Sequence, residues 1–136
     1  MIESCEEIGI DAGIEDLCEI IREECAAIHR YLRHGHLAKV YENALAHRLR
    51  GQAMVVEQQY PLSVYDEDGT HLGSFVADLV VEGTLLVELK TCPALRPEHL
   101  LQTTGYLAAA QLAHGLVINF GAPALELRRL FRAAGR

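Results

Sequence analysis

The chain has 136 residues, half of them hydrophobic, and its formal net charge at pH 7 is −7. Such a length suits one domain with a substantial core, so residues 1–136 are taken as a single domain in which residues 1–12 are a candidate flexible segment. The negative charge argues against a broad electrostatic grip on nucleic acid. No apolar run reaches the roughly 18 residues that span a bilayer, and the acidic start lacks a signal-peptide pattern, so we expect no membrane association and a soluble, cytoplasmic protein.

Two helices are predicted in the first part of the chain. Apolar residues recur with helical spacing from about Gly13 to Arg33, and again from about Leu37 to Arg50. Gly35 and Gly51 follow these segments as stop signals.

Strand patterns come next. We expect strands over residues 54–59 with a continuation at 62–65, then over 71–81 and 85–91. A helix is expected from about Pro97 to His114, stopped by Gly115, and then a short buried strand over 116–120. Residues 125–130 suit either a last strand or a helical turn. The order ααβββαβ predicts an α/β (α+β) fold in which helices flank a mixed sheet.

The cysteines and histidines show no metal-binding spacing. The four cysteines form no C-x-x-C pair, and Cys18 and Cys25 share one helical face with Ile21 and Ile28. We therefore expect buried structural thiols in preference to a metal or redox site. None of the seven histidines forms a zinc-ligand pair with another histidine or a cysteine.

Three charged residues interrupt the apolar strands: Asp78, Glu88 and Lys90. Glu88 and Lys90 are two residues apart, so both project from one face of their strand. Asp78 lies opposite Glu88 only if the loop is the three-residue segment 82–84; a two-residue loop would pair it with Leu89. We expect the three-residue loop, which lets both carboxylates share one Mg²⁺ or Mn²⁺.

In this arrangement the backbone carbonyl of Leu89 is a candidate third metal ligand. The alternative is a surface ion pair between Glu88 and Lys90, with Asp78 at the end of an edge strand.

The spacing Asp78, then Glu88-Leu89-Lys90, resembles the D…(D/E)-x-K signature of the PD-(D/E)XK nuclease superfamily. Further segments are similar to the small bacterial GxxExxY proteins of that superfamily: Ile28-His29-Arg30, residues 35–45, His99-Leu100-Leu101-Gln102 with Tyr106-Leu107, and residues 119–123. The resemblance covers roughly residues 14–131. It implies a restriction-endonuclease-like core and metal-dependent cleavage of DNA or RNA.

The chain departs from this resemblance at one position. Gly35 and Tyr41 of the G-x-x-E-x-x-Y motif are kept, but its Glu is Ala38 here. Glu42 lies one helical turn further along, about 5.4 Å away, and is a further candidate metal ligand.

The resemblance implies roles for the remaining site residues. Asp78 and Glu88 hold the metal ion, while Lys90 orients water or offsets transition-state charge. Gln102 positions water or phosphate near the lysine. Tyr41 and Tyr106 are supporting residues for which plain packing is an equal alternative, and His99 is expected at the surface or as a helix cap.

Three functions are compatible with these observations. The first is a Mg²⁺-dependent nuclease acting on DNA or RNA. The second is a catalytically degenerate nuclease fold that binds nucleic acid or a protein partner, suggested by Ala38 and the acidic charge. The third is a homo-oligomeric module that associates through residues 116–120 or the face of Cys18 and Cys25.

Overall fold

The computed structural model describes residues 2–132, with side chains from residue 13 onward. This part of the chain forms three helices and five strands. The helices are α1 (Ile2–Leu32), α2 (Ala38–Gly51) and α3 (Pro97–Ala110); the strands are β1 (Val56–Tyr65), β2 (His71–Val81), β3 (Leu85–Lys90), β4 (His114–Asn119) and β5 (Glu126–Phe131). The predicted α+β fold with a mixed, helix-flanked sheet is confirmed, and residues 126–131 form a strand instead of a helical turn.

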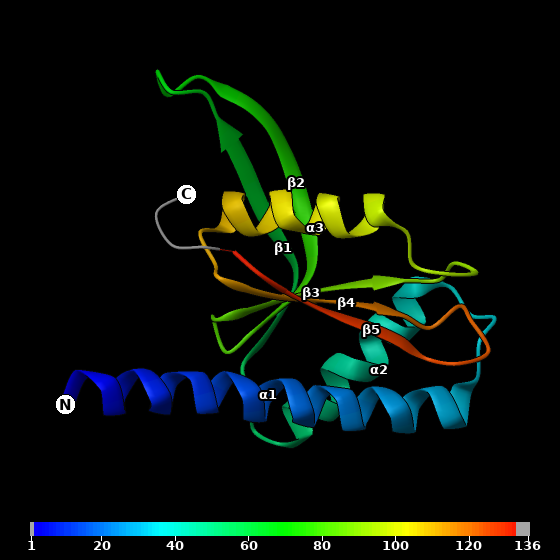
Figure 1. Ribbon diagram of the computed structural model, residues 1–136. Helices are drawn as coiled ribbons and strands as arrows, with labels where there is room; N and C mark the ends of the chain where they lie inside the picture. The colour runs from blue at the N-terminus through cyan, green and yellow to red at the C-terminus, as the bar shows by residue number, and fades with distance from the viewer. Residues whose placement is uncertain (1, 133–136) are drawn as a thin grey trace.

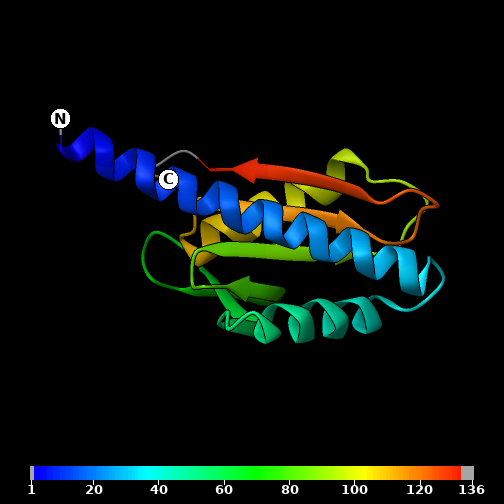
Figure 2. The same cartoon turned by 90° about the horizontal axis from the view of Figure 1, so that it is seen from below.

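The five strands form one sheet in the order β1-β2-β3-β4-β5. All neighbours are antiparallel except β3 and β4, which are parallel and joined through α3. Helices α1 and α2 cover one face and α3 covers the other (Figure 1). Viewed from the side of α1, that helix runs across the sheet with α2 beside it (Figure 2). The sheet is therefore the middle layer of three.

The main core lies between the sheet and the pair α1 and α2. Cys18, Ile21, Cys25 and Ile28 of α1 are buried there against β-strand residues, so both thiols are structural, as predicted. All but the first residue of β4 are buried. Both surfaces considered for self-association, the Cys18/Cys25 face and residues 116–120, are thus internal to the chain, and that part of the third interpretation is wrong.

Strands β1 and β2 extend beyond β3 as a two-stranded ribbon that rises past α3 (Figure 1). Leu79 packs in the core next to α1, whereas Ala77, two residues earlier, packs in a second cluster with Leu86 and Leu107. Alternate residues of a strand normally share a face, so the ribbon turns over between these two positions. Opposite this point in β1, Gln59 has a positive φ of 55°.

Two predicted boundaries are wrong. Helix α1 begins at Ile2 instead of near Gly13; the side chains of residues 1–12 lie outside the described part, so their flexibility stays a prediction. Helix α3 ends at Ala110 because Gln111 adopts the left-handed conformation with φ 57°. Gly115 belongs to β4, where a Cβ atom would lie 3.2 Å from Leu107. It permits close packing of β4 on α3 instead of ending the helix.

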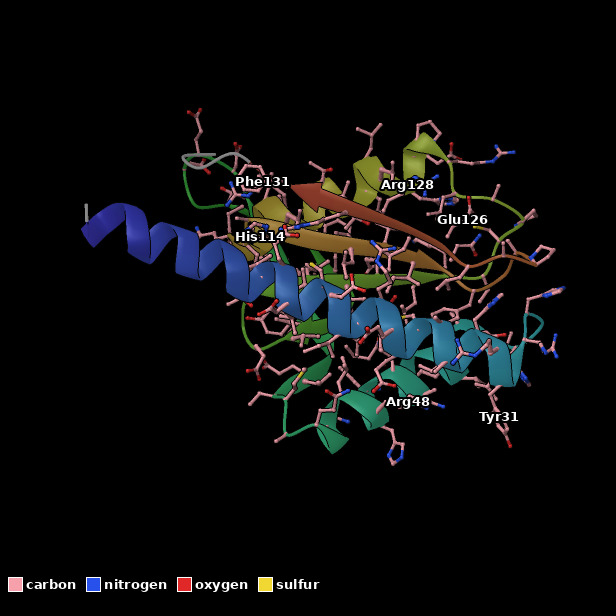
Figure 3. All side chains as sticks on the ribbon, turned by 60° about the horizontal axis from the view of Figure 1, so that its bottom comes forward. Tyr31, Arg48, His114, Glu126, Arg128 and Phe131 are labelled. Atoms are coloured by element: carbon pink, nitrogen blue, oxygen red, sulfur yellow. The ribbon has the colours of Figure 1, made fainter. Side chains whose placement is uncertain are left out.

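Asn119 joins the loops at the ends of β3, β4 and β5. Its side chain is fully buried, accepts hydrogen bonds from the N–H groups of Cys92 and Gly121, and donates to the Cys92 carbonyl and to Glu126. Figure 3 shows Glu126 on β5, the strand next to β4. The 119–123 segment that suggested a family resemblance therefore contributes to loop structure beside Lys90. No helix in the described part of the chain has the length and apolar character needed to cross a membrane.

Candidate functional site

The register of the β2–β3 hairpin decides whether Asp78 and Glu88 meet. Val81 pairs with Leu85, and Leu79 pairs with Val87. The three-residue loop is therefore confirmed and the two-residue alternative is wrong. The next pair in this register is Asp78 with Glu88, at the point where the ribbon begins to leave β3.

Asp78 and Glu88 are tied together through the backbone. The N–H of Asp78 donates to Oε2 of Glu88 at 2.7 Å, and the N–H of Leu89 donates to Oδ2 of Asp78 at 2.8 Å. Each carboxylate accepts a bond from the neighbouring strand, where the strands part. Glu88 is only 5% exposed, which excludes the surface ion-pair interpretation. Asp78 is also not on an edge strand, because β1 lies outside β2.

Lys90 lies on the same face as Glu88. Its Nζ donates a hydrogen bond to Oε1 of Gln102 on α3 at 2.9 Å. Val87 and Leu89 point to the opposite face, into the core beside α1. The predicted alternation of β3 and the predicted proximity of Gln102 to Lys90 both agree with the structure.

Glu42 approaches the site from α2 on the other side of the sheet. Its carboxylate is 3% exposed, and accepts hydrogen bonds from Gln59 at 2.8 Å, Gln58 at 2.7 Å and Lys39 at 3.0 Å. The Gln59 amide is also close enough to the Asp78 carboxylate to lower its pKa slightly. Gln59 therefore links the acid on α2 to the acid on β2.

Burial is the largest influence on the two strand carboxylates. Desolvation, followed by repulsion from Asp78, raises the pKa of Glu88 to about 7 from an ordinary 4.5. Desolvation also raises the pKa of Asp78, although the hydrogen bond from Leu89 opposes it. The charge of Lys90 lowers both pKa values and that of Glu42 raises them. A buried and a half-buried carboxylate so close together carry negative charge that a bound cation would stabilise.

The donor set fits a divalent cation that keeps part of its water shell. Among side chains from residue 13 to 132, no three His, Cys, Asp or Glu groups are placed to hold a metal ion. Asp78 and Glu88 would supply two ligands, each through the oxygen that the backbone bonds leave. The Leu89 N–H points toward β2, and in a strand the carbonyl of the same residue points to that side too, which is the side expected of a third ligand. Mg²⁺ is commonly held by one or two carboxylates with several waters.

The supporting residues differ in how close they come to the site. Burial, and after it the charges of Glu88 and Asp78, raises the pKa of the Tyr106 phenol. The ring of Tyr41 is buried and stacks on Phe120 with centroids 4.5 Å apart. Its hydroxyl donates to the Arg33 carbonyl and accepts from the N–H of His36, so it stabilises the α1–α2 loop instead of reaching the site edge.

Two further positions complete the comparison with the sequence. His99 is a helix cap, since its Nδ1 accepts the N–H of Arg96 at 2.9 Å. Gln59 was missed. The only sequence feature that could have indicated it is the polar pair Gln58-Gln59 in an otherwise half-buried strand. Such a pair is equally compatible with exposure to solvent.

Comparison with known proteins agrees with this geometry. The sequence profile of the PD-(D/E)XK nuclease superfamily matches residues 15–130, and the chain belongs to this superfamily. Members of the superfamily generally use divalent metal ions. A search of curated protein sequences finds no match.

Among solved structures, the fold is similar to the crystal structure of SSO0001, with a TM-score of 0.54 and 15% sequence identity. The match covers 69% of this chain and 49% of that one, so the chain spans about half the length of this relative. At this identity the likeness concerns the fold, which is the expected restriction-endonuclease-like core.

Proposed function

We propose that the chain is a metal-dependent nuclease that hydrolyses phosphodiester bonds of DNA or RNA at Asp78, Glu88 and Lys90. The observation that carries the proposal is the pair of half-buried Asp78 and buried Glu88, with Lys90 on the same face as Glu88. A bound Mg²⁺ or Mn²⁺ would polarise the phosphoryl oxygen and acidify a coordinated water. The nearer resemblance to the GxxExxY proteins is part of this proposal.

The protein groups divide the remaining work. Asp78, Glu88 and the Leu89 carbonyl hold the cation, and Gln102 directs the ammonium group of Lys90. Lys90 stabilises the negative charge that develops on the phosphoryl group or orients the attacking water. Glu42 acts through Gln59, which orients the Asp78 carboxylate.

The position of Glu42 bears on the loss of the motif Glu at Ala38. Ala38 is the first residue of α2, whereas Glu42 is buried and bonded to Gln59. This supports an active enzyme, because the acidic group of α2 that reaches the site is still present. We accordingly expect Ala38→Glu to change the cleavage rate little.

The test is cleavage of labelled single- and double-stranded DNA and RNA with Mg²⁺ or Mn²⁺. We expect Lys90→Ala to lower kcat by about 100-fold or more, as removal of a transition-state stabiliser commonly does. Arg22→Ala is a matched control, since it also removes one positive charge but lies in an exposed pair with Glu19. Equal rates in Lys90→Ala and the native chain would reject the site.

The second candidate is a nuclease fold that binds nucleic acid or a protein without cleaving it. One observation favours it: the described side chains provide two carboxylates for the metal and no third. Native chain that binds Mn²⁺ but cleaves none of the four substrates, while Ala38→Glu does cleave, would support this alternative.

A further inference from the structure

A groove lies between the outer ribbon and α3. A hollow of about 320 Å³ is lined there by Val64, Phe75, Leu101, Gln102, Gly105 and Tyr106. A second hollow of similar size shares Val64 and Gly105 with it, so the groove continues along the helix. Pockets for small organic groups begin at roughly 300 Å³, so the first hollow has room for one planar ring system.

The groove adjoins the proposed active site through two shared residues. Gln102 lines the groove and also accepts the hydrogen bond from Lys90 Nζ. Tyr106, one helical turn after Gln102 on α3, also lines the groove, and the charges of Glu88 and Asp78 act on its phenol. A phosphodiester bound at Lys90 would therefore have its neighbouring nucleoside at the mouth of the groove.

The lining is apolar although it faces solvent. Phe75 is 44% exposed and Leu101 is 72% exposed. The rings of Phe75 and Tyr106 lie 5.8 Å apart and are tilted by 39°, so they form two walls of one corner. Aromatic and apolar walls of this kind are how proteins hold unstacked bases.

Charge favours the same ligand chemistry. With a net charge of −7, the chain has little long-range attraction for phosphates. Affinity for nucleic acid must then come largely from short-range contacts, and only an unpaired base offers its ring faces. Bases inside a duplex are stacked on both sides and cannot enter a hollow in the protein.

We propose that the groove binds an unpaired base next to the phosphodiester held at Asp78, Glu88 and Lys90, which makes single-stranded nucleic acid the preferred substrate. This inference rests on the proposed function for the position of the phosphate.

Gly105 provides a clean steric test. It is in the middle of α3, and a Cβ atom there meets nothing within 4 Å, so a larger side chain would fill the groove without disturbing the fold. Gly105→Leu blocks the groove, and Gly105→Ala is the matched control that adds one methyl group. Both replace a helical glycine, so neither should destabilise α3. Phe75→Ala removes one wall instead of filling the space.

The measurement is fluorescence anisotropy with labelled single- and double-stranded DNA and RNA in Mg²⁺, in a Lys90→Ala background so that the probe is not consumed. We expect tighter binding to the single strands. Gly105→Leu and Phe75→Ala should each weaken that binding by about 5- to 100-fold, the effect of losing one stacked base. Gly105→Ala should bind like its parent, and all variants should keep its circular dichroism.

Several outcomes would overturn the inference: equal affinity for duplex and single strand, unchanged single-strand binding in Gly105→Leu, or a native dimer by light scattering that Gly105→Leu dissociates. Comparison of the DNA and RNA probes shows whether the groove prefers deoxyribose or ribose nucleotides. Failure of the proposed function looks different, because the native chain would then cleave nothing while groove-dependent binding of single strands persisted. Cleavage with a duplex preference would reject the groove alone.

Discussion

Asp78 and Glu88 have a structural role in addition to the chemical role proposed for them. Each accepts a backbone N–H of the opposite strand at the point where β2 and β3 separate. Truncation to alanine would leave a buried donor unpaired, which typically costs about 1–3 kcal/mol. Asp78→Asn and Glu88→Gln keep an acceptor oxygen and are the variants that separate catalysis from folding.

The raised pKa of Glu88 predicts a pH-dependent stability of the metal-free protein. The carboxyl is easier to protonate in the folded chain, with a pKa of about 7, than in the unfolded chain, where the ordinary value is 4.5. Protonated Glu88 therefore contributes stability to the folded chain that is fully present below about pH 4.5 and is lost as pH rises through 7. The full difference corresponds to about 3 kcal/mol.

Urea unfolding between pH 5 and pH 8 measures this effect. We expect the free energy of unfolding to fall more with rising pH in the native chain than in Glu88→Gln. Both proteins contain the same histidines, so the comparison cancels their contribution. Mg²⁺ should restore stability to the native chain at pH 8. Parallel pH profiles for the two proteins would contradict the assignment.

Gln59 is predicted to be a positioning residue for the metal site. Removing a group that orients a metal ligand commonly lowers metal affinity or activity by about 10- to 100-fold. We expect Gln59→Ala to weaken Mn²⁺ binding, measured by calorimetry, by at least the lower of these factors. Gln52→Ala is the control, because Gln52 is exposed and bonds to Glu24. Equal Mn²⁺ affinity in the two variants would remove Gln59 from the site.

At the scale of elements, patterns that depend on local periodicity could be predicted. Strand β2 begins and ends at the expected residues, His71 and Val81. The hairpin register agrees with the three-residue loop expected over residues 82–84. Ends set by tertiary contacts could not be predicted. Gly115 looked like a stop signal, but its role is to let β4 pack closely against Leu107 of α3.

In the candidate site, too, the residues set by local sequence pattern could be predicted and those set by tertiary structure could not. Charged residues within apolar strands can be recognised in the sequence, which is how Asp78, Glu88 and Lys90 were predicted. Gln102 was predicted from the family resemblance. The contact between Gln59 and Glu42 depends on the point where the ribbon turns over. There Gln59 has a positive φ, which nothing in the sequence predicts. A side chain brought to a site by such a local irregularity can be found only in three dimensions.

Gly121 is predicted to be required for the junction between the ends of β3 and β4. A Cβ atom there would lie 2.8 Å from the Cys92 carbonyl oxygen and closer still to the backbone nitrogen. We expect Gly121→Ala to lower the free energy of unfolding by about 1–3 kcal/mol or more through overpacking. Gly51→Ala is the control, since its Cβ meets nothing within 4 Å. Thermal unfolding that ranks the two variants equally would contradict this.

On the scale of the whole molecule, the proposed active site lies where all three layers meet. Glu42 comes from the layer of α1 and α2, Gln102 from α3, and the two carboxylates from the sheet between them. Detachment of either helix layer would therefore dismantle the site, so activity and global folding should be lost together.

Thiol labelling tests how cooperatively the layers hold together. Burial raises the pKa of both Cys18 and Cys25, so neither forms a reactive thiolate in the folded chain. In a Cys5→Ser, Cys92→Ser variant we expect the two remaining thiols to react only when urea unfolds the protein, in step with the loss of circular dichroism. Rapid labelling under native conditions would mean that α1 opens independently of the sheet.

The short loop between β2 and β3 has a consequence for how this protein can diverge. Its three residues set which side chain faces which along the whole hairpin, and Asp78 meets Glu88 several residues away from it. Insertion or deletion of one residue in this loop would move Asp78 and Glu88 to opposite faces of the sheet although neither residue is itself changed. Natural variants should therefore keep the number of residues between the strands fixed, even where the residue type at the exposed position 84 changes.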